Sequence, residues 1–575
     1  MLRKWEKTGP GQWRTLEVPK PVTMLRFLLP PIFAASAAAA QQAGPPAVAS
    51  PTSGRSVGRG AQPDLSAVAS AKAALSAVAS AKAALSAVAS AKADTIPDAV
   101  VAIARSTPAA ELRRLLFALA APGMEGRRMA TRGDSAAARY VATRFTELRL
   151  APPSHRGYYQ PITARRRTRA ATLTLGNRRY PWGAGWNLYP RADSLQLRNA
   201  PIMWAGADSA LGFLGRLQAT DLQGKVVLLP GMPFRLGQFD RLDSAESILK
   251  GRGAAAVLWT DSRVAKAHRR REAFAFLPEY EARVDDQNPS TAFTEIGLLP
   301  ALMAGLLQGE SGLRVDSSGT ISGPRAPETF PLQATLSLEV QSTYHEETAP
   351  NVLGVLRGND PDASCIVVTA HRDHDGLNGK TLYPGAVDNA SGTVALIQLA
   401  DMMQQAARAG HRPRRTIVFA SVTGEERGLL GSAWYTDHPA IPLAKTRAVL
   451  NIDMLGRVDT FYRNRRADSN YVYVLVEDSA RIGLLEEVRS ANAVFNALRL
   501  DDRYTRPPGY QRMLRGSDHY PFFLKKIPFV YFATGFSEDY HQPTDTPDRI
   551  NYDLLTKQTQ LAFLTLWNMA NSPGR

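Results

Sequence analysis

The chain has 575 residues, more than one compact core accommodates, so we expect two or three structural units. Hydrophobic residues make up 44% and charged residues 21%, a balance that is ordinary for a soluble globular protein. The formal net charge is +17, but the basic clusters Arg165–Arg167 and Arg269–Arg271 are short and lie in no recognisable nucleic-acid-binding motif. We therefore expect no nucleic-acid partner. Cys365 is the only cysteine, which excludes an intrachain disulfide.

The N-terminal residues are typical of a processed leader. Residues 24–40 read MLRFLLPPIFAASAAAA, in which a basic residue and a short apolar stretch precede small residues in Ala-x-Ala spacing. This is the pattern of a secretory signal peptide, with Met24 as the expected start and cleavage near Ala40. An uncleaved anchor is the alternative, but the apolar stretch is short for a bilayer span. We therefore predict a leader over residues 1–41 and a secreted or periplasmic protein without stable membrane insertion.

Residues 42–95 are predicted to be a low-complexity linker. The segment is rich in Ala, Gly, Pro and Ser, and the sequence LSAVASAKAA recurs every ten residues from Leu65, Leu75 and Leu85. Repeats of this length are too short to form solenoid units, and each offers few large apolar side chains for burial. We expect a mobile, partly helical spacer that carries no catalytic group.

Ordered sequence is predicted to begin near Ile96. Helical spacing of apolar residues over 109–119 and 134–148 indicates the first part of an α/β domain, which we place at 96–198. Residues 199–343 have a different character, with short apolar strands separated by a helix. They contain no cluster of His, Asp and Glu, and we expect a separate small α/β or β-rich unit.

Apolar strands and helices alternate through residues 344–575. The strand patterns are short runs of β-branched or aromatic residues, at 365–370, 416–422, 449–452, 471–476 and 529–532. Such continuous runs suit strands that helices bury on both faces. The predicted fold class is α/β: an α/β/α sandwich with a mixed, largely parallel central sheet, plus the smaller inserted unit.

Polar side chains that can bind metal lie next to these strands. Three clusters follow strand ends, one precedes the first crossover helix, and one lies in a turn after the last strand. They are His371 with Asp373, Glu425 with Glu426, Asp453, Asp388, and Tyr540 with His541. Each alone has an ordinary structural explanation, such as a solvated helix face or a turn. Because buried strand ends converge in space, the joint pattern predicts one common site.

The residue types in this set favour a pair of metal ions. Imidazole nitrogens and carboxylate oxygens bind zinc at about 2.0–2.2 Å. One carboxylate can bridge two ions about 3.5–4 Å apart, and bound metal lowers the pKa of water from about 15.7 towards 7. Of two adjacent glutamates, one can be a ligand while the other accepts a proton and delivers it to a leaving amine.

Six segments, in this order, resemble the motif set of metallopeptidase family 28. They read AHRDHDG, GAVDNASG, GEERGLLGS, NIDMLGR, GSDHYPFF and DYHQPTDTPDRI. The family includes secreted bacterial leucyl aminopeptidases, aminopeptidase Y and glutamate carboxypeptidase II, and the resemblance extends from about Ala109 to the C-terminus. It implies a catalytic di-zinc domain formed by residues 96–198 and 344–575. Residues 199–343 are similar to the protease-associated (PA) domain that many members carry as an apical insertion.

The resemblance implies two Zn²⁺ ions and a ligand set. One ion would be bound by His371, Asp388 and Asp453, and the other by Asp388, Glu426 and His541, so that Asp388 bridges them. The family pattern also implies a cis peptide bond after Asp388.

The same motifs imply roles for three further side chains. Glu425 would be the general base that activates zinc-bound water, Asp373 would orient His371, and Tyr540 would hydrogen-bond the tetrahedral oxyanion. The chain departs from the family at Arg372, where an aromatic residue is usual, and at Val387, where a second Asp is usual. Neither position is a ligand, but Arg372 could change the charge of the pocket and with it the substrate preference.

The implied activity is a zinc-dependent exopeptidase acting on peptides or small proteins. Aminopeptidase activity is favoured, with carboxypeptidase or dipeptidase activity as the alternative. An aminopeptidase needs acidic groups near the metals to neutralise an α-ammonium, whereas a carboxypeptidase needs a cation for the α-carboxylate. Arg372, Arg457 and Arg515 lie in or near the motifs and could supply that cation.

Three other classes fit the sequence less well. Related co-catalytic zinc deacylases insert a dimerisation domain before the final histidine, but only 88 positions separate Asp453 from His541. Glutaminyl cyclases hold one zinc and lack the first histidine ligand, which His371 supplies here. Receptor ectodomains of the same fold have lost ligands that this chain retains. The sequence does not indicate an oligomeric state.

Overall fold

The structure is a computed structural model that describes residues 3–9, 12–17 and most of residues 96–572. Within the last range it leaves out 190–193, 208–219, 230–247, 261, 263, 267–276, 281–293, 311, 362, 463–468, 479–481 and 508. Strands β1 (Arg3–Gly9) and β2 (Gln12–Glu17) form an antiparallel pair. The expected signal sequence at residues 24–40 and the expected linker at 42–95 lie outside the described residues. Among the described helices, none combines the length and apolar character that a bilayer crossing requires.

Four parallel strands form the centre of the main sheet. In spatial order they are β17 (Ile417–Val422), β14 (Cys365–His371), β18 (Thr446–Ile452) and β21 (Phe529–Ala533). The strand β19 (Tyr471–Glu477) is antiparallel to β21 and parallel to the edge strand β20 (Arg499–Asp501), while β13 (Phe330–Leu356) runs antiparallel to β17 on the other side. Every residue of β14, β17 and β21 is buried, as expected for strands covered on both faces. The prediction of a mixed, largely parallel sheet is confirmed.

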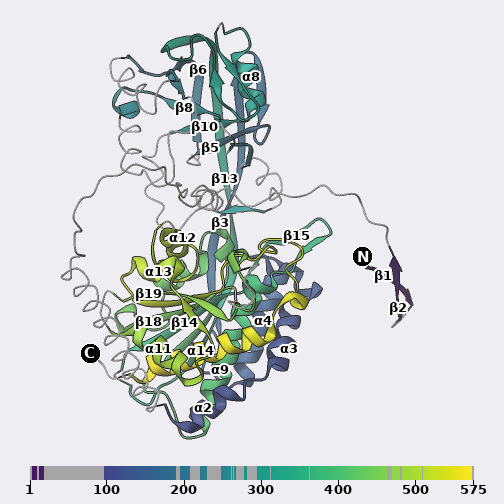
Figure 1. Cartoon of the computed structure of the whole chain (residues 1–575), viewed down its shortest axis with the longest axis vertical. Coiled ribbons are helices and arrows are strands. Elements are labelled where there is room, and N and C mark those ends of the chain that lie inside the picture. Colours follow the sequence, from purple (N-terminus) through teal and green to yellow (C-terminus); the bar gives the residue numbers. More distant parts are fainter. Residues whose placement is uncertain are drawn as a thin grey trace, which may run out of the picture.

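Helices cover both faces of this sheet (Figure 1). Alternate residues of each strand point to opposite faces, so Ile366 and Val368 belong to one core while Val367 belongs to the other. One face packs against α2 (Asp98–Arg105), α3 (Ala109–Leu119), α4 (Arg132–Glu147), α9 (Ser391–Arg408), α11 (Leu484–Phe495) and α14 (Tyr552–Asn571). The other packs against α10 (Leu430–Asp437), α12 (Tyr510–Arg515) and α13 (His519–Leu524). The architecture is the expected α/β/α sandwich.

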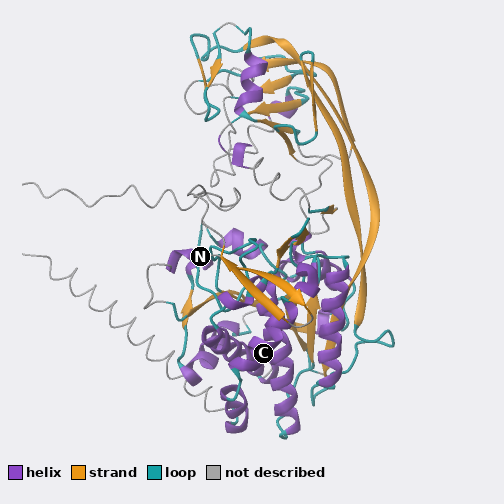
Figure 2. Cartoon of the chain, turned by 90° about the vertical axis from the view of Figure 1, so that its right-hand side faces the viewer, coloured by secondary structure: helices purple, strands orange, loops and turns teal. Residues whose placement is uncertain are grey.

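Two long strands connect the sandwich to a second unit. The strand β3 (Tyr159–Leu175) pairs with β13 along its full length, from Val352 opposite Tyr159 to Leu336 opposite Leu175. Figure 2 shows these strands running from the helical unit to the β-rich unit. The main sheet therefore continues from one unit into the other through β13.

The second unit contains mostly short strands. From β13 the order is β6 (Ser194–Trp204), β7 (Val226–Leu228), β8 (Ala256–Trp259), β10 (Glu295–Leu298) and β5 (Trp186–Tyr189), with α8 (Pro300–Leu307) packed on them. Smaller strands are β4 (Arg178–Pro181), β9 (Glu279–Tyr280), β11 (Arg314–Val315), β12 (Ile321–Ser322), β15 (Gly376–Asn378) and β16 (Thr381–Tyr383), the last two in the main unit. Because β3 extends into the second unit, the core of this unit includes Ala171, Leu173 and Trp186. The unit therefore begins before residue 199.

Candidate metal centre

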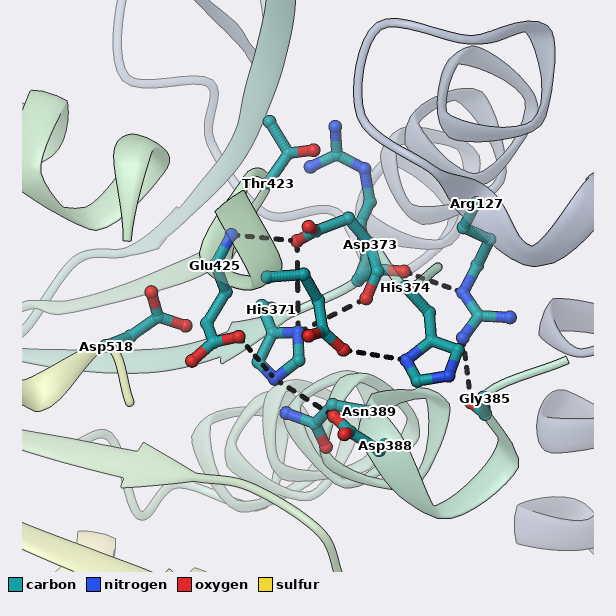
Figure 3. Close-up of polar contacts among 12 residues, drawn as sticks. Arg127, His371, Asp373, His374, Gly385, Asp388, Asn389, Thr423, Glu425 and Asp518 are labelled. Atoms are coloured by element: carbon teal, nitrogen blue, oxygen red, sulfur yellow. Dashed lines mark hydrogen bonds and ion pairs between the residues drawn. The ribbon is translucent and has the colours of Figure 1, made fainter. Parts of the chain in front are cut away.

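The expected site residues lie at one edge of the central sheet. His371 is the last residue of β14, Glu425 and Glu426 lie in a short turn after β17, and Asp453 follows β18. These strands are parallel, so their carboxyl ends meet at the same edge. Asp388 reaches the same place from the segment Ala386–Ala390 that precedes α9 (Figure 3). The peptide bond between Asp388 and Asn389 is cis, as the resemblance implies.

The first group of possible ligands consists of His371, Asp388 and Asp453, all buried. The His371 Nε2 atom lies 3.3 Å from Asp453 Oδ1 and 3.5 Å from Asp388 Oδ1. In a tetrahedral zinc site with bonds near 2.1 Å, neighbouring ligand atoms lie about 3.4 Å apart. Both distances from His371 Nε2 are therefore those expected between ligands of one zinc ion.

The second group involves the other oxygen of Asp388. His541 Nε2 lies 3.2 Å from Asp388 Oδ2 and also 3.2 Å from Glu426 Oε2. The two carboxylate oxygens of Asp388 thus face two different histidines, one in each group. This is the arrangement that a carboxylate needs to bridge two ions.

Glu425 and Asp373 lie beside the first group. Glu425 Oε2 is 3.9 Å from His371 Nε2, and the Glu425 backbone N–H donates to Asp373 Oδ1 at 3.2 Å. The His371 Nδ1 atom lies 3.2 Å from the backbone carbonyl oxygen of Asp373 and 3.8 Å from its carboxylate. Only the carbonyl is within hydrogen-bonding distance. Asp373 therefore contacts His371 through its backbone, while its carboxylate contacts the turn that carries Glu425.

Tyr540 lies against the second group. Its ring centroid is 4.1 Å from that of His541 and 5.0 Å from that of Phe536. Burial raises the pKa of Tyr540 above its usual value, so the hydroxyl keeps its proton at neutral pH. A cleft beside the site is lined by Asp388, Glu425, Asp453, Met454, Arg512, Met513, Gly516, Tyr531, Phe536 and Tyr540.

Three further charged or polar side chains were not expected from the sequence. His374 Nδ1 lies 2.7 Å from Glu426 Oε1, and Asp375 Oδ2 lies 2.8 Å from His541 Nδ1. Both residues follow Asp373 in the segment HRDHDG, in which the family resemblance implies roles only for His371 and Asp373. Arg512 lines the cleft, with its guanidinium 3.6 Å from the centroid of the Phe536 ring. No local motif marked Arg512, because the fold brings α12 to the cleft.

The site concentrates acidic groups where water is largely excluded. Burial, opposed by His371 and reinforced by Glu426, raises the pKa of Glu425 well above its usual value. Burial and the neighbouring Glu426 likewise raise the pKa of Asp388. Burial lowers the pKa of His374 to about 4, so its imidazole is neutral. Buried carboxylates in this number require compensating positive charge, and the His, Asp and Glu donor set suits zinc.

A buried arginine braces the loop that carries Asp388. Arg127 is fully buried and donates to the backbone oxygens of Arg372 at 2.6 Å, Leu119 at 2.9 Å, Pro384 at 2.7 Å and Gly385 at 2.7 Å. Figure 3 shows its guanidinium between His374 and Gly385. Arg127 thereby fixes the backbone three residues before Asp388.

None of the three arginines expected near the pocket lines the cleft. Arg372 is fully buried and pairs with Asp134 at 2.8 Å, and it also donates to the Ser421 carbonyl. It follows His371 at the end of a strand and therefore points to the opposite side. Arg457 pairs with Asp539, and Arg515 is exposed beside Tyr520. The expected effect of Arg372 on the charge of the pocket is not supported by this placement.

Comparison with known proteins finds similarity to a peptidase family over part of the main unit. Residues 351–566 match the sequence profile of Peptidase family M28. A "Probable zinc metalloprotease" of Pyrenophora teres f. teres is 26% identical over an alignment of 281 residues, and the match covers 42% of this chain and 57% of that protein. "Aminopeptidase NAALADL1" of Mus musculus is 32% identical over 128 residues, 22% of this chain and 16% of that protein. The matched residues therefore span 57% of the length of the first relative and 16% of the length of the second.

A solved structure shares the fold. The aminopeptidase from Aneurinibacillus sp. strain AM-1 superposes with a TM-score of 0.50, covering 82% of this chain and 96% of that one. The sequence identity is 18%, so this likeness concerns the fold alone.

Proposed function

We propose that this chain is a zinc-dependent exopeptidase and that aminopeptidase activity is favoured. The proposal starts from the match of residues 351–566 to Peptidase family M28. The observation that carries the proposal is the position of Asp388 between two histidines. Its Oδ1 lies 3.5 Å from His371 Nε2 and its Oδ2 lies 3.2 Å from His541 Nε2. We assign one Zn²⁺ to His371, Asp388 and Asp453, and a second to Asp388, Glu426 and His541.

The side chains around the two assigned ions have distinct tasks. Bound zinc would supply Lewis acidity and lower the pKa of a water molecule. Glu425 lines the cleft with Asp388 and Asp453, and its side chain is 12% exposed, so it can exchange protons with a substrate there. Glu425 accepts the proton of the attacking water and passes it to the leaving amine. Tyr540, which keeps its proton, donates to the oxygen that becomes negatively charged.

Acidic groups around the cleft favour an aminopeptidase. Two carboxylates there are not assigned to a metal ion: Glu425 lines the cleft, and the buried Asp518 lies close to Glu425 (Figure 3). Such a surface attracts the α-ammonium of a peptide N-terminus.

Arg512 favours a second candidate activity. Its guanidinium lines the same cleft as Glu425 and lies over the Phe536 ring, where it can bind a substrate carboxylate. A dipeptide offers an α-ammonium to the acidic groups and a carboxylate to Arg512 at once. The second candidate is therefore a dipeptidase or carboxypeptidase.

One experiment tests the proposal and separates the two candidates. The full chain, purified with zinc in the buffers, is analysed for metal and assayed with aminoacyl amides, free dipeptides and N-acetylated dipeptides. Two zinc ions per chain and cleavage of unblocked substrates are expected. Hydrolysis of amides as fast as dipeptides supports the aminopeptidase, whereas a preference for dipeptides that Arg512→Met abolishes supports the dipeptidase. A folded chain that binds no zinc contradicts both.

We also propose, from the sequence pattern, that residues 24–40 direct secretion and that the second unit is a PA-like insertion. Two observations support the insertion. Most of the second unit lies between β3 and β13 in the sequence, and the unit has a hydrophobic core of its own. Extracellular fractionation of the source cells tests the first point.

A further inference from the structure

We propose that the adjacent residues His374 and Asp375 are positioning residues that orient the two terminal ligands of the second metal ion, Glu426 and His541. This inference rests on the proposed di-zinc function. It concerns the fourth and fifth residues of the HRDHDG segment, which have no role in the proposed chemistry.

Asp375 orients His541. Its Oδ2 lies 2.8 Å from His541 Nδ1, while the opposite ring atom, Nε2, faces Asp388 and Glu426. A carboxylate that accepts the Nδ1 proton leaves the Nε2 lone pair directed at the metal position. Asp375 is fully buried, and Arg427 donates to its Oδ1, so the carboxylate is held on both sides.

His374 orients Glu426 in the same manner. Its Nδ1 lies 2.7 Å from Glu426 Oε1, whereas Glu426 Oε2 faces His541 Nε2 at 3.2 Å. One oxygen is thus engaged by His374 and the other is directed at the metal position. Because His374 faces a carboxylate, its proton belongs on Nδ1.

Packing fixes the imidazole of His374. The ring is fully buried and lies 5.1 Å from the ring of His541, edge to face. A Cβ atom at Gly385 would lie 2.4 Å from His374 Cγ, so the loop before Asp388 closes directly over this ring. His374 therefore has little freedom to turn away from Glu426.

His374 and Asp375 also have possible ligand atoms within 4.8 Å of those of Glu426, but their contact distances are those of orienting residues. Atoms that share a tetrahedral zinc ion lie about 3.4 Å apart, as in the groups around His371 and His541. The 2.7 Å and 2.8 Å separations made by His374 and Asp375 are hydrogen-bond lengths. The two residues therefore belong to the layer that supports the ligands.

The test measures zinc affinity, which a change in catalytic chemistry alone would not alter. Asp375→Asn and His374→Leu are introduced into the full chain, and zinc dissociation constants are measured by competition with a chromogenic chelator. Each substitution is expected to weaken one of two ions about 10- to 100-fold. His374→Gln, which keeps an N–H donor, is expected to recover part of the affinity. Unfolding midpoints of the metal-free proteins show whether each variant folds.

Double substitutions locate the effect. In a His371→Ala background, which retains the second site, Asp375→Asn should still weaken the remaining ion. In a His541→Ala background, which retains the first site, Asp375→Asn should leave the affinity of the remaining ion unchanged. Equal weakening in both backgrounds indicates a general structural role and overturns the inference. Wild-type affinity in Asp375→Asn and His374→Leu overturns it too, while a wild-type chain without zinc overturns the proposed function itself.

Discussion

Replacing Arg127 by Met removes the brace beside the metal centre while keeping an unbranched apolar stem. Arg127 donates to four buried backbone oxygens, those of Leu119, Arg372, Pro384 and Gly385. A buried acceptor left without a partner costs about 1 kcal/mol or more. The Gly385 oxygen also accepts from the Ala390 N–H, so three oxygens lose their partner, which gives about 3 kcal/mol. Burial lowers the pKa of Arg127 to about 10, so the guanidinium is charged at neutral pH.

The assay is equilibrium unfolding of the zinc-free chain in guanidinium chloride, followed by circular dichroism and tryptophan fluorescence. Arg127→Met should lower the free energy of unfolding of the main unit by about 3 kcal/mol. Arg127→Lys should recover only part of this loss, because an ammonium cannot reach four carbonyls that a planar guanidinium spans.

Arg132→Met is the matched control. Arg132 lies five residues away and pairs with Glu125, but its side chain is 81% exposed. An exposed pair contributes little to stability, so the control should be nearly neutral. If Arg127→Met is no more destabilising than Arg132→Met, the carbonyls are satisfied in another way and the reasoning is wrong.

Three further predictions concern catalysis and metal binding. Glu425→Gln should reduce kcat by several orders of magnitude while both zinc ions stay bound, which metal analysis beside a peptidase assay will show; activity near that of the wild type would remove Glu425 as the base. Removal of zinc by a chelator should lower the thermal unfolding midpoint, and added zinc should restore it in the wild type but not in Asp388→Ala; an unchanged midpoint would mean that the folded chain binds no zinc. Deletion of residues 41–94 should leave kcat/KM unchanged, and a folded but inactive deletion variant would contradict this.

Much of the main unit follows from local patterns in the sequence. The helix expected at 109–119 is α3, and the strand runs ending near His371, Val422 and Ile452 are β14, β17 and β18. Continuous apolar runs and helical periodicity are strong signals because both faces of these elements are buried. The long pairing of β3 with β13 was not anticipated, because its residues alternate between exposed and buried without a clear start or end.

The supporting residues were harder to predict than the ligands. Arg127 donates to backbone oxygens, and Arg372 donates to a backbone oxygen and pairs with Asp134, which is distant in the sequence. Such contacts leave no pattern of side-chain types in the sequence. Arg127 also lies in a segment with left-handed backbone angles, φ 50° at Glu125 and φ 55° at Arg127. The residue types at these two positions do not predict this conformation. Ligand types are restricted by metal chemistry, whereas any residue with a suitable donor can support a ligand.

The carboxylate proposed as the bridge, that of Asp388, is held in place by segments from across the chain. Asp545 accepts the backbone N–H groups of Val387 at 3.0 Å and Asp388 at 3.3 Å, and the Asn389 side chain donates to the Ile452 carbonyl at 3.0 Å. Arg127 holds the same loop from a segment that lies outside the matched residues 351–566. A fragment restricted to the matched residues would therefore contain every proposed ligand and still lack one of the groups that place Asp388. The candidate metal centre therefore depends on the whole α/β/α unit, including residues 96–150, and not on the proposed ligands alone.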